Sequence, residues 1–244
     1  MAEAAPRPAF YAAAGGGWRD WWTLLHPPYT AWHLSYVVIG ACLAPRVQLS
    51  RLVATLLAFF LAVGVAAHAL DELHGRPLRT RIPSGALVAA TAVGLAGAVV
   101  LGAIGVARVG WVLVPFIVLG PVLVVAYNAE LFGGVVHTDL GFALAWGAFP
   151  VLTAYVAQAA TLRLAGALGA AGALAMSGAQ RSLSTPARRL RRRVAGIGGS
   201  ITYDDGTVEP LEIRGLLSPL ERALRAMSWG MVALAAAMAF ARLS

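Results

Sequence analysis

The sequence has no lysine, a single cysteine and few charged residues of either sign. Only 12% of its 244 residues are charged, whereas 59% are hydrophobic, and the mean hydropathy is +0.73. Because a soluble domain of this length cannot hide so much apolar surface, the composition excludes an ordinary water-soluble globular protein. The lone Cys42 excludes both an intramolecular disulfide and a cysteine-based metal site.

The positive charge is carried by arginine and is concentrated in one part of the chain. Six of the 19 arginines lie between Arg181 and Arg193. A nucleic-acid-binding protein spreads basic and aromatic side chains over an exposed surface, whereas here the arginines flank apolar stretches. We therefore expect the membrane lipid bilayer, and no nucleic acid, as the partner.

Apolar stretches long enough to cross a hydrocarbon core recur along the chain. The expected fold class is all-α, a polytopic transmembrane helical bundle with about seven spans. The short, Ala/Gly-rich sixth span has a re-entrant hairpin as its alternative. Arginine-rich loops gather on one side of such a bundle, which predicts a multi-pass cell-membrane protein with a cytoplasmic N-terminus. The spans are expected at 27–45, 51–73, 84–107, 110–128, 138–160, 163–180 and 220–241.

These spans divide the chain into four expected parts. Residues 1–26 form an interfacial segment, because tryptophan beside charge suits the membrane surface. Residues 27–180 form a bundle of six spans, and residues 218–244 form the seventh transmembrane helix. The basic loop 181–217 between them is expected to begin a helix near Pro186 and to continue as a β-hairpin.

The densest group of polar residues lies at the C-terminal end of the second expected span. His68, Asp71 and Glu72 stand at helical positions i, i+3 and i+4, so they share one face. Imidazole and carboxylate groups in such a stripe are candidate ligands for a divalent metal and candidate catalytic groups. The alternative is an interfacial ion-pair cluster, in which arginines of the following loop neutralise the acids. Those arginines are Arg76, Arg79 and Arg81.

Other polar residues are expected at the same membrane face. With a cytoplasmic N-terminus, the start of the first span and the loops after spans two and four all open on that side. All five histidines are then at or just inside one face of the membrane. The further residues expected at this mouth are His26, Tyr29, His33, His74, Tyr127, Asn128, Glu130, His137 and Asp139.

Short motifs in the first five spans resemble the UbiA-type membrane prenyltransferase superfamily, and they occur in the order found in that family. Over roughly 125 residues, they are Leu25-His26-Pro27, Arg76-Pro77-Leu78 with Ile82-Pro83-Ser84-Gly85, and Tyr127 with Leu140-Gly141-Phe142-Ala143-Leu144-Ala145-Trp146-Gly147-Ala148.

The resemblance implies an intramembrane transferase that moves a prenyl group from an isoprenoid diphosphate, or that acts on another lipid substrate. Asp71, Glu72 and His68 would hold Mg²⁺, and Arg76, Arg79 and Arg81 would neutralise phosphate. The opposite wall of the substrate site would consist of Tyr127, Asn128, Glu130, His137 and Asp139.

Departures from the family pattern keep two other hypotheses open. Where the family has an Asn-Asp-x-x-Asp-x-x-x-Asp motif, this chain has Ala67, His68, Asp71 and Gly75, and the second Asp-rich motif has no counterpart. One alternative is a membrane enzyme that uses a His/carboxylate site for a transition metal such as iron or zinc. The other is a non-catalytic lipid-binding or partner subunit, which predicts a closed bundle without a polar cavity.

Overall fold

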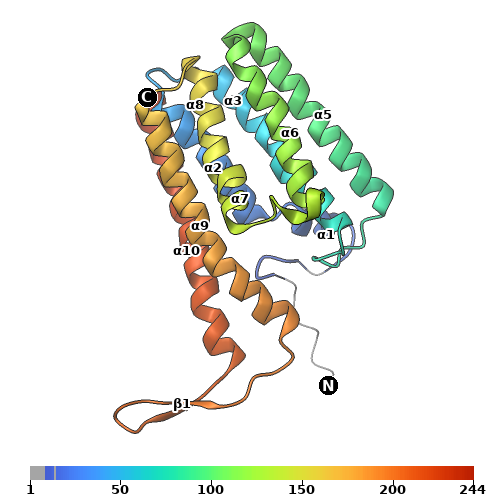
Figure 1. Ribbon diagram of the computed structural model, residues 1–244, viewed down its shortest axis with the longest axis vertical. Helices are drawn as coiled ribbons and strands as arrows, with labels where there is room; N and C mark the ends of the chain where they lie inside the picture. The colour runs from blue at the N-terminus through green and yellow to red at the C-terminus, as the bar shows by residue number, and fades with distance from the viewer. Residues whose placement is uncertain (1–8, 14) are drawn as a thin grey trace.

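The computed structural model describes residues 9–13 and 15–244 and is an almost entirely helical bundle (Figure 1). Residues 1–8 of the expected interfacial segment lie outside the described residues. The helices, in chain order, are α1 (Trp18–Leu24), α2 (Pro27–Leu43), α3 (Leu49–Phe59), η1 (Phe60–Ala67), α4 (His68–Leu73), α5 (Ser84–Val109), η2 (Trp111–Leu113), α6 (Val114–Asn128), η3 (Leu131–Gly134), α7 (Asp139–Ala143), η4 (Leu144–Ala148), α8 (Phe149–Ala159), α9 (Leu164–Arg193) and α10 (Ile213–Leu243).

Within the described residues, five helices are long and apolar enough to cross a membrane. They confirm the prediction of an all-α membrane bundle. Their outer surfaces carry exposed aliphatic side chains, such as Val93 and Ile104 of α5, which suit contact with lipid tails. The five are Leu49–Leu73, Ser84–Val109, Trp111–Asn128, Asp139–Ala159 and Ile213–Leu243.

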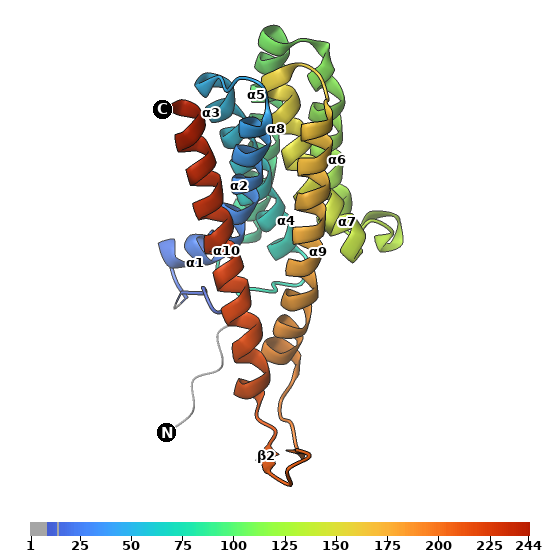
Figure 2. The same ribbon diagram turned by 90° about the vertical axis from the view of Figure 1, so that its left-hand side faces the viewer.

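The expected count of seven spans is therefore wrong by two. The helix that corresponds to the first expected span, α2, has only 17 residues and buries the polar side chains of Thr30, His33 and Ser35. The helix that corresponds to the sixth, α9, ends in three consecutive arginines. Both helices pack within the bundle, α2 against α8 and α10, and α9 against α7 and α10 (Figures 1 and 2).

Two membrane-crossing helices contain π-helical turns. Segment η1 lies between α3 and α4, and η4 lies between α7 and α8, so each span continues through its π-helical part. Such turns change the backbone hydrogen-bonding pattern inside a helix and frequently occur at functional sites. Here η1 ends immediately before His68, and η4 contains Trp146.

Helix α9 differs from the expectation at the basic segment. It is one continuous helix across residue 180, so the expected domain boundary lies inside it, and Pro186 stands in its interior rather than at a helix start. A proline removes a backbone donor. Near this point the hydroxyls of Ser182 and Ser184 donate to the carbonyls of Ala179 and Arg181.

Helices α9 and α10 run side by side beyond the ends of the other helices (Figures 1 and 2). We call this end of the molecule the basic end, because Arg181 to Arg193 lie there. The two helices are joined by the predicted hairpin, β1 (Ser200–Thr202) antiparallel to β2 (Val208–Pro210). Its turn contains Gly206 with a φ of 83°, a left-handed conformation that glycine adopts readily. The hairpin prediction is confirmed.

Helix α1 lies near the same level as α4 and α7 in Figure 2. Its Trp18, Trp21 and Trp22 are exposed, as expected for rings at a membrane surface. Its Asp20 is instead buried, and the carboxylate accepts hydrogen bonds from the backbone N–H groups of Gly16 and Arg81. The helix is thereby tied to the loop after α4.

Candidate functional site

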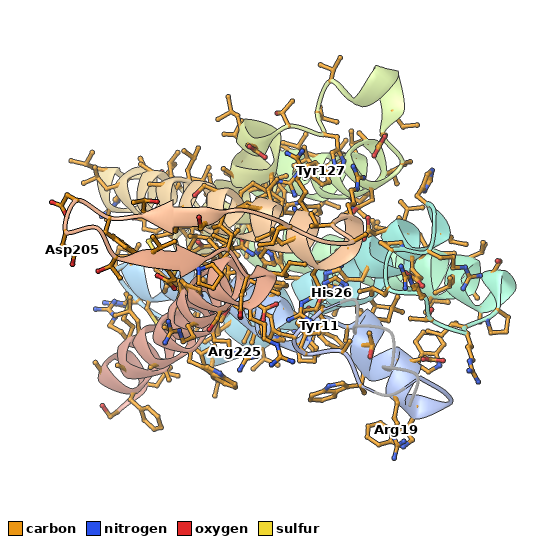
Figure 3. The ribbon with its side chains drawn as sticks, turned by 90° about the horizontal axis from the view of Figure 1, so that it is seen from below. Tyr11, Arg19, His26, Tyr127, Asp205 and Arg225 are labelled. Atoms are coloured by element: carbon orange, nitrogen blue, oxygen red, sulfur yellow. The ribbon has the colours of Figure 1, made fainter. Side chains whose placement is uncertain are left out.

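A cavity of about 360 Å³ opens at the basic end, between α2, α4, α6 and α9. Its lining confirms that the histidines gather at one end of the bundle, because all five border this cavity. Figure 3 shows the end from below, with Tyr11 beside His26 near the centre and Tyr127 on the neighbouring wall. The histidines are His26, His33, His68, His74 and His137.

The exposed imidazole of His74 makes a 3.3 Å hydrogen bond to the Leu70 carbonyl of its own helix. Three of the four less exposed imidazoles are also held by backbone carbonyl groups. Nδ1 of His33 donates to the Trp146 carbonyl at 2.9 Å, Nδ1 of His68 to that of Gly64 at 3.1 Å, and Nδ1 of His137 to that of Tyr127 at 3.0 Å. Trp146 and Gly64 belong to the two π-helical segments. Because a carbonyl only accepts, Nδ1 carries the hydrogen, and in the neutral ring Nε2 is a hydrogen-bond acceptor.

The fourth imidazole, His26, is held by a different kind of contact. Its Nδ1 shares a 2.8 Å hydrogen bond with the Tyr11 hydroxyl, and its ring stacks on His68 with the centroids 4.2 Å apart. Burial, and secondly His68, lowers the pKa of His26 well below its usual value. Burial, and secondly Tyr29, raises the pKa of Tyr11 well above its usual value. Both side chains are therefore neutral at neutral pH.

The structure separates the predicted catalytic stripe. Asp71 and His68 line the cavity, but Glu72 is fully buried on another side. Its two carboxylate oxygens accept hydrogen bonds from the backbone N–H groups of Leu78 and Thr80, and from the Thr80 hydroxyl, at 2.9 Å each. Glu72 therefore holds the loop that follows α4, and it does not line the cavity with the other two residues of the stripe.

The geometry does not support the predicted metal centre. Among the described residues, no group of three or more His, Cys, Asp or Glu side chains is placed to hold a metal ion. His68, Asp71 and Glu72 fail to assemble because Glu72 faces the loop. Among the described residues, this stripe therefore does not assemble the several oxygen ligands that Mg²⁺ prefers or the three or more ligands usual for a transition metal.

The arginines predicted to bind phosphate also lie elsewhere. Arg76 donates to the carbonyls of Thr80 and Ile82 and to the Ser84 hydroxyl, so it braces its own loop. Arg79 and Arg81 are exposed and do not border the cavity. The loop that carries them is held away from the cavity, because its backbone N–H groups at Thr80 and Arg81 donate to Glu72 and to Asp20 of α1.

A different set of arginines, from the basic segment 181–193, lines the cavity. The described lining contains five arginines and only three acids, so positive charge is in excess. Burial, and secondly Arg181, lowers the pKa of Arg188 below its usual value. In the described part of the chain, its guanidinium makes only a 3.5 Å hydrogen bond, to Thr185. The five are Arg181, Arg188, Arg191, Arg192 and Arg193.

The predicted opposite wall is assembled in part. Tyr127, Glu130 and His137 line the cavity. Asn128 does not, because its amide donates to the Val124 carbonyl of its own helix at 2.8 Å. Asp139 instead accepts a 2.7 Å hydrogen bond from Nε of Arg181, which does line the cavity.

A second, largely apolar cavity of about 300 Å³ lies among α3, α5, α6 and α8. Trp146 and Phe59 belong to its wall. The Trp146 ring contacts Tyr127 of the polar cavity, with the centroids 5.8 Å apart. One pair of aromatic rings thus joins the walls of the two cavities.

Comparisons with protein-family models, with curated proteins and with solved structures find no match to this chain.

Proposed function

We propose that this membrane protein is a transferase that binds an isoprenoid or other lipid substrate by its phosphate or diphosphate group in the polar cavity. The observation that carries the proposal is the convergence of five arginines and five histidines on one cavity at the end of a membrane bundle. Guanidinium groups bind phosphate oxygens through strong, charge-assisted hydrogen bonds. Fixed positive charge also stabilises a departing diphosphate.

The neighbouring apolar cavity supports a lipid as the substrate. A hydrocarbon chain attached to a phosphate in the polar cavity would pass Tyr127 and Trp146 to reach it. Its lining is largely aliphatic and aromatic, with Phe116, Leu123 and Phe149 among its side chains, which suits contact with a hydrocarbon chain. Ligand sites of this kind are largely apolar with a few polar groups that set orientation.

The resemblance to the UbiA-type superfamily favours prenyl transfer as the reaction, and the positive-inside rule places the basic end in the cytoplasm. The two alternatives have less support. A metal-dependent enzyme lacks an assembled donor set among the described residues. A decayed, non-catalytic subunit predicts a bundle without a polar cavity, whereas this one has a cavity of about 360 Å³.

Arg188→Gln tests the phosphate site against a matched control, Arg189→Gln. Arg189 is on the same helix and loses the same charge, but it is exposed and does not line the cavity. The affinity for geranylgeranyl diphosphate, titrated by calorimetry in a neutral detergent, should fall about 10- to 100-fold in Arg188→Gln. It should stay within about twofold in Arg189→Gln. Equal affinities in the two variants, or equally tight binding of geranylgeraniol, would refute the proposal.

Removal of divalent metal should leave this binding intact. Because arginines supply the positive charge, the affinity for geranylgeranyl diphosphate in EDTA is expected to stay within about threefold of the value measured with Mg²⁺. A loss of binding in EDTA that added Mg²⁺ restores would instead support the metal-dependent alternative.

A further inference from the structure

Three buried polar atoms in the wall of the polar cavity have no hydrogen-bond partner among the residues that the structure describes. Among the described residues, the cavity-lining atoms in this state are Nε2 of His26, the hydroxyl of Tyr127 and Oε1 of Gln180. Gln180 is only 3% exposed and Tyr127 only 6%. A buried polar atom without a partner lowers the stability of the fold, so a ligand that supplies partners gains binding energy there.

The wall opposite the arginines is rich in groups that only accept hydrogen bonds. Nε2 of His33, His68 and His137 has this character, because each Nδ1 donates to a carbonyl. The Asp71 carboxylate also lines the cavity, and the described residues donate no hydrogen bond to it. A ligand that brings hydrogen-bond donors would therefore be complementary to this wall.

A phosphate group cannot satisfy that need. Ionised phosphate oxygens only accept, so they pair with Arg188 and its neighbours and leave the acceptor wall unpaired. A cationic donor such as an ammonium group is disfavoured, because the lining holds five arginines and three acids. Neutral hydroxyl groups remain: they donate to imidazole and carboxylate acceptors, and they pair equally well with the Tyr127 hydroxyl.

We infer that the cavity binds, beside the phosphate, a group that bears hydroxyls, such as the headgroup of a polyol phosphate lipid. The inference rests on the proposed function, which places the phosphate against the arginines. The hydroxyls would pair with Tyr127, Gln180 and the histidine Nε2 atoms. The cavity volume of about 360 Å³ is in the range of small-molecule sites.

Two lipids that differ only in hydroxyl groups test the inference. Dioleoylphosphatidylglycerol and dioleoylphosphatidylmethanol carry the same chains and the same phosphodiester charge, and only the first has hydroxyls in its headgroup. In neutral detergent, phosphatidylglycerol should bind at least about tenfold more tightly, as two neutral hydrogen bonds predict.

Tyr127→Phe should remove much of that preference. The Tyr127 hydroxyl has no hydrogen-bond partner in the described part of the chain, so the variant should fold as well as the parent. Tyr155→Phe is the matched control, because Tyr155 is buried but does not line the polar cavity.

The outcomes separate the inference from the proposed function. Equal affinity for the two lipids, with both weakened by Arg188→Gln, would overturn the inference and keep the phosphate site. If both Tyr127→Phe and Gln180→Leu keep the preference for phosphatidylglycerol, the assignment of these two residues to the hydroxyl-binding wall would be wrong. Lipid binding that is absent, or unaffected by Arg188→Gln, would overturn both.

Discussion

Glu72→Ala is expected to lower the free energy of unfolding by about 3 to 5 kcal/mol, because it leaves buried donors without a partner. The Glu72 carboxylate is 0% exposed and receives both backbone N–H groups and one hydroxyl from the loop at Leu78 and Thr80. In thermal unfolding followed by tryptophan fluorescence, the Tm should fall by about 10 °C.

The control for Glu72→Ala is Glu212→Ala. Glu212 is exposed at the start of α10 and makes no side-chain capping hydrogen bond, so its loss should leave Tm within about 2 °C. Glu72→Gln should lie between the two, because its amide offers one acceptor oxygen and sets an NH₂ group against a backbone donor. An unchanged Tm for Glu72→Ala, with lost diphosphate binding, would restore Glu72 to the ligand site.

Gly40→Ala is expected to destabilise the bundle by about 2 to 3 kcal/mol, because it forces α2 away from α8. A Cβ atom at Gly40 would lie 2.4 Å from the carbonyl oxygen and 2.9 Å from the Cα atom of Val151. Both are backbone atoms of α8, so the strain can be relieved only by moving a helix. The same unfolding experiment should show a Tm lower by about 5 to 10 °C.

Gly172→Ala provides the comparison for Gly40→Ala. It places the same methyl group in α9, where no described heavy atom lies within 4 Å of the new Cβ. Alanine is the better helix former by about 1 kcal/mol, so Tm should be unchanged or slightly higher. Equal Tm values for the two variants would show that α2 and α8 do not approach so closely.

The class of the protein and its hairpin could be predicted from the chain because both depend on local patterns. A long apolar run predicts a membrane-spanning helix without any knowledge of the tertiary structure around it. The turn around Gly206 likewise lies within one short segment. Even so, the predicted span count was too high. Helix α2 has only 17 residues and buries polar side chains, and α9 continues from an apolar half into a run of arginines.

Part of the candidate site could be predicted from the sequence, namely the residues that lie near the end of an expected span. The five histidines were placed at one end of the bundle because each lies near the end of an expected span. Their tautomers depend on carbonyls released near π-helical turns, which no hydropathy pattern marks. The unpartnered Gln180 and the paired Asp139 had no sequence signal that distinguished their roles.

The sequence by itself determined that this is a helical membrane protein and that its five histidines gather at one end of the bundle. Only the tertiary structure decided which polar residues face each other. Glu72 and Arg76 turned to their own loop, while α9 brought Arg188 to a cavity that is lined in part by α2 and α4, more than 100 residues earlier in the chain. The physical reason is that the direction of a side chain depends on helix rotation and packing, which the local pattern of residues leaves open.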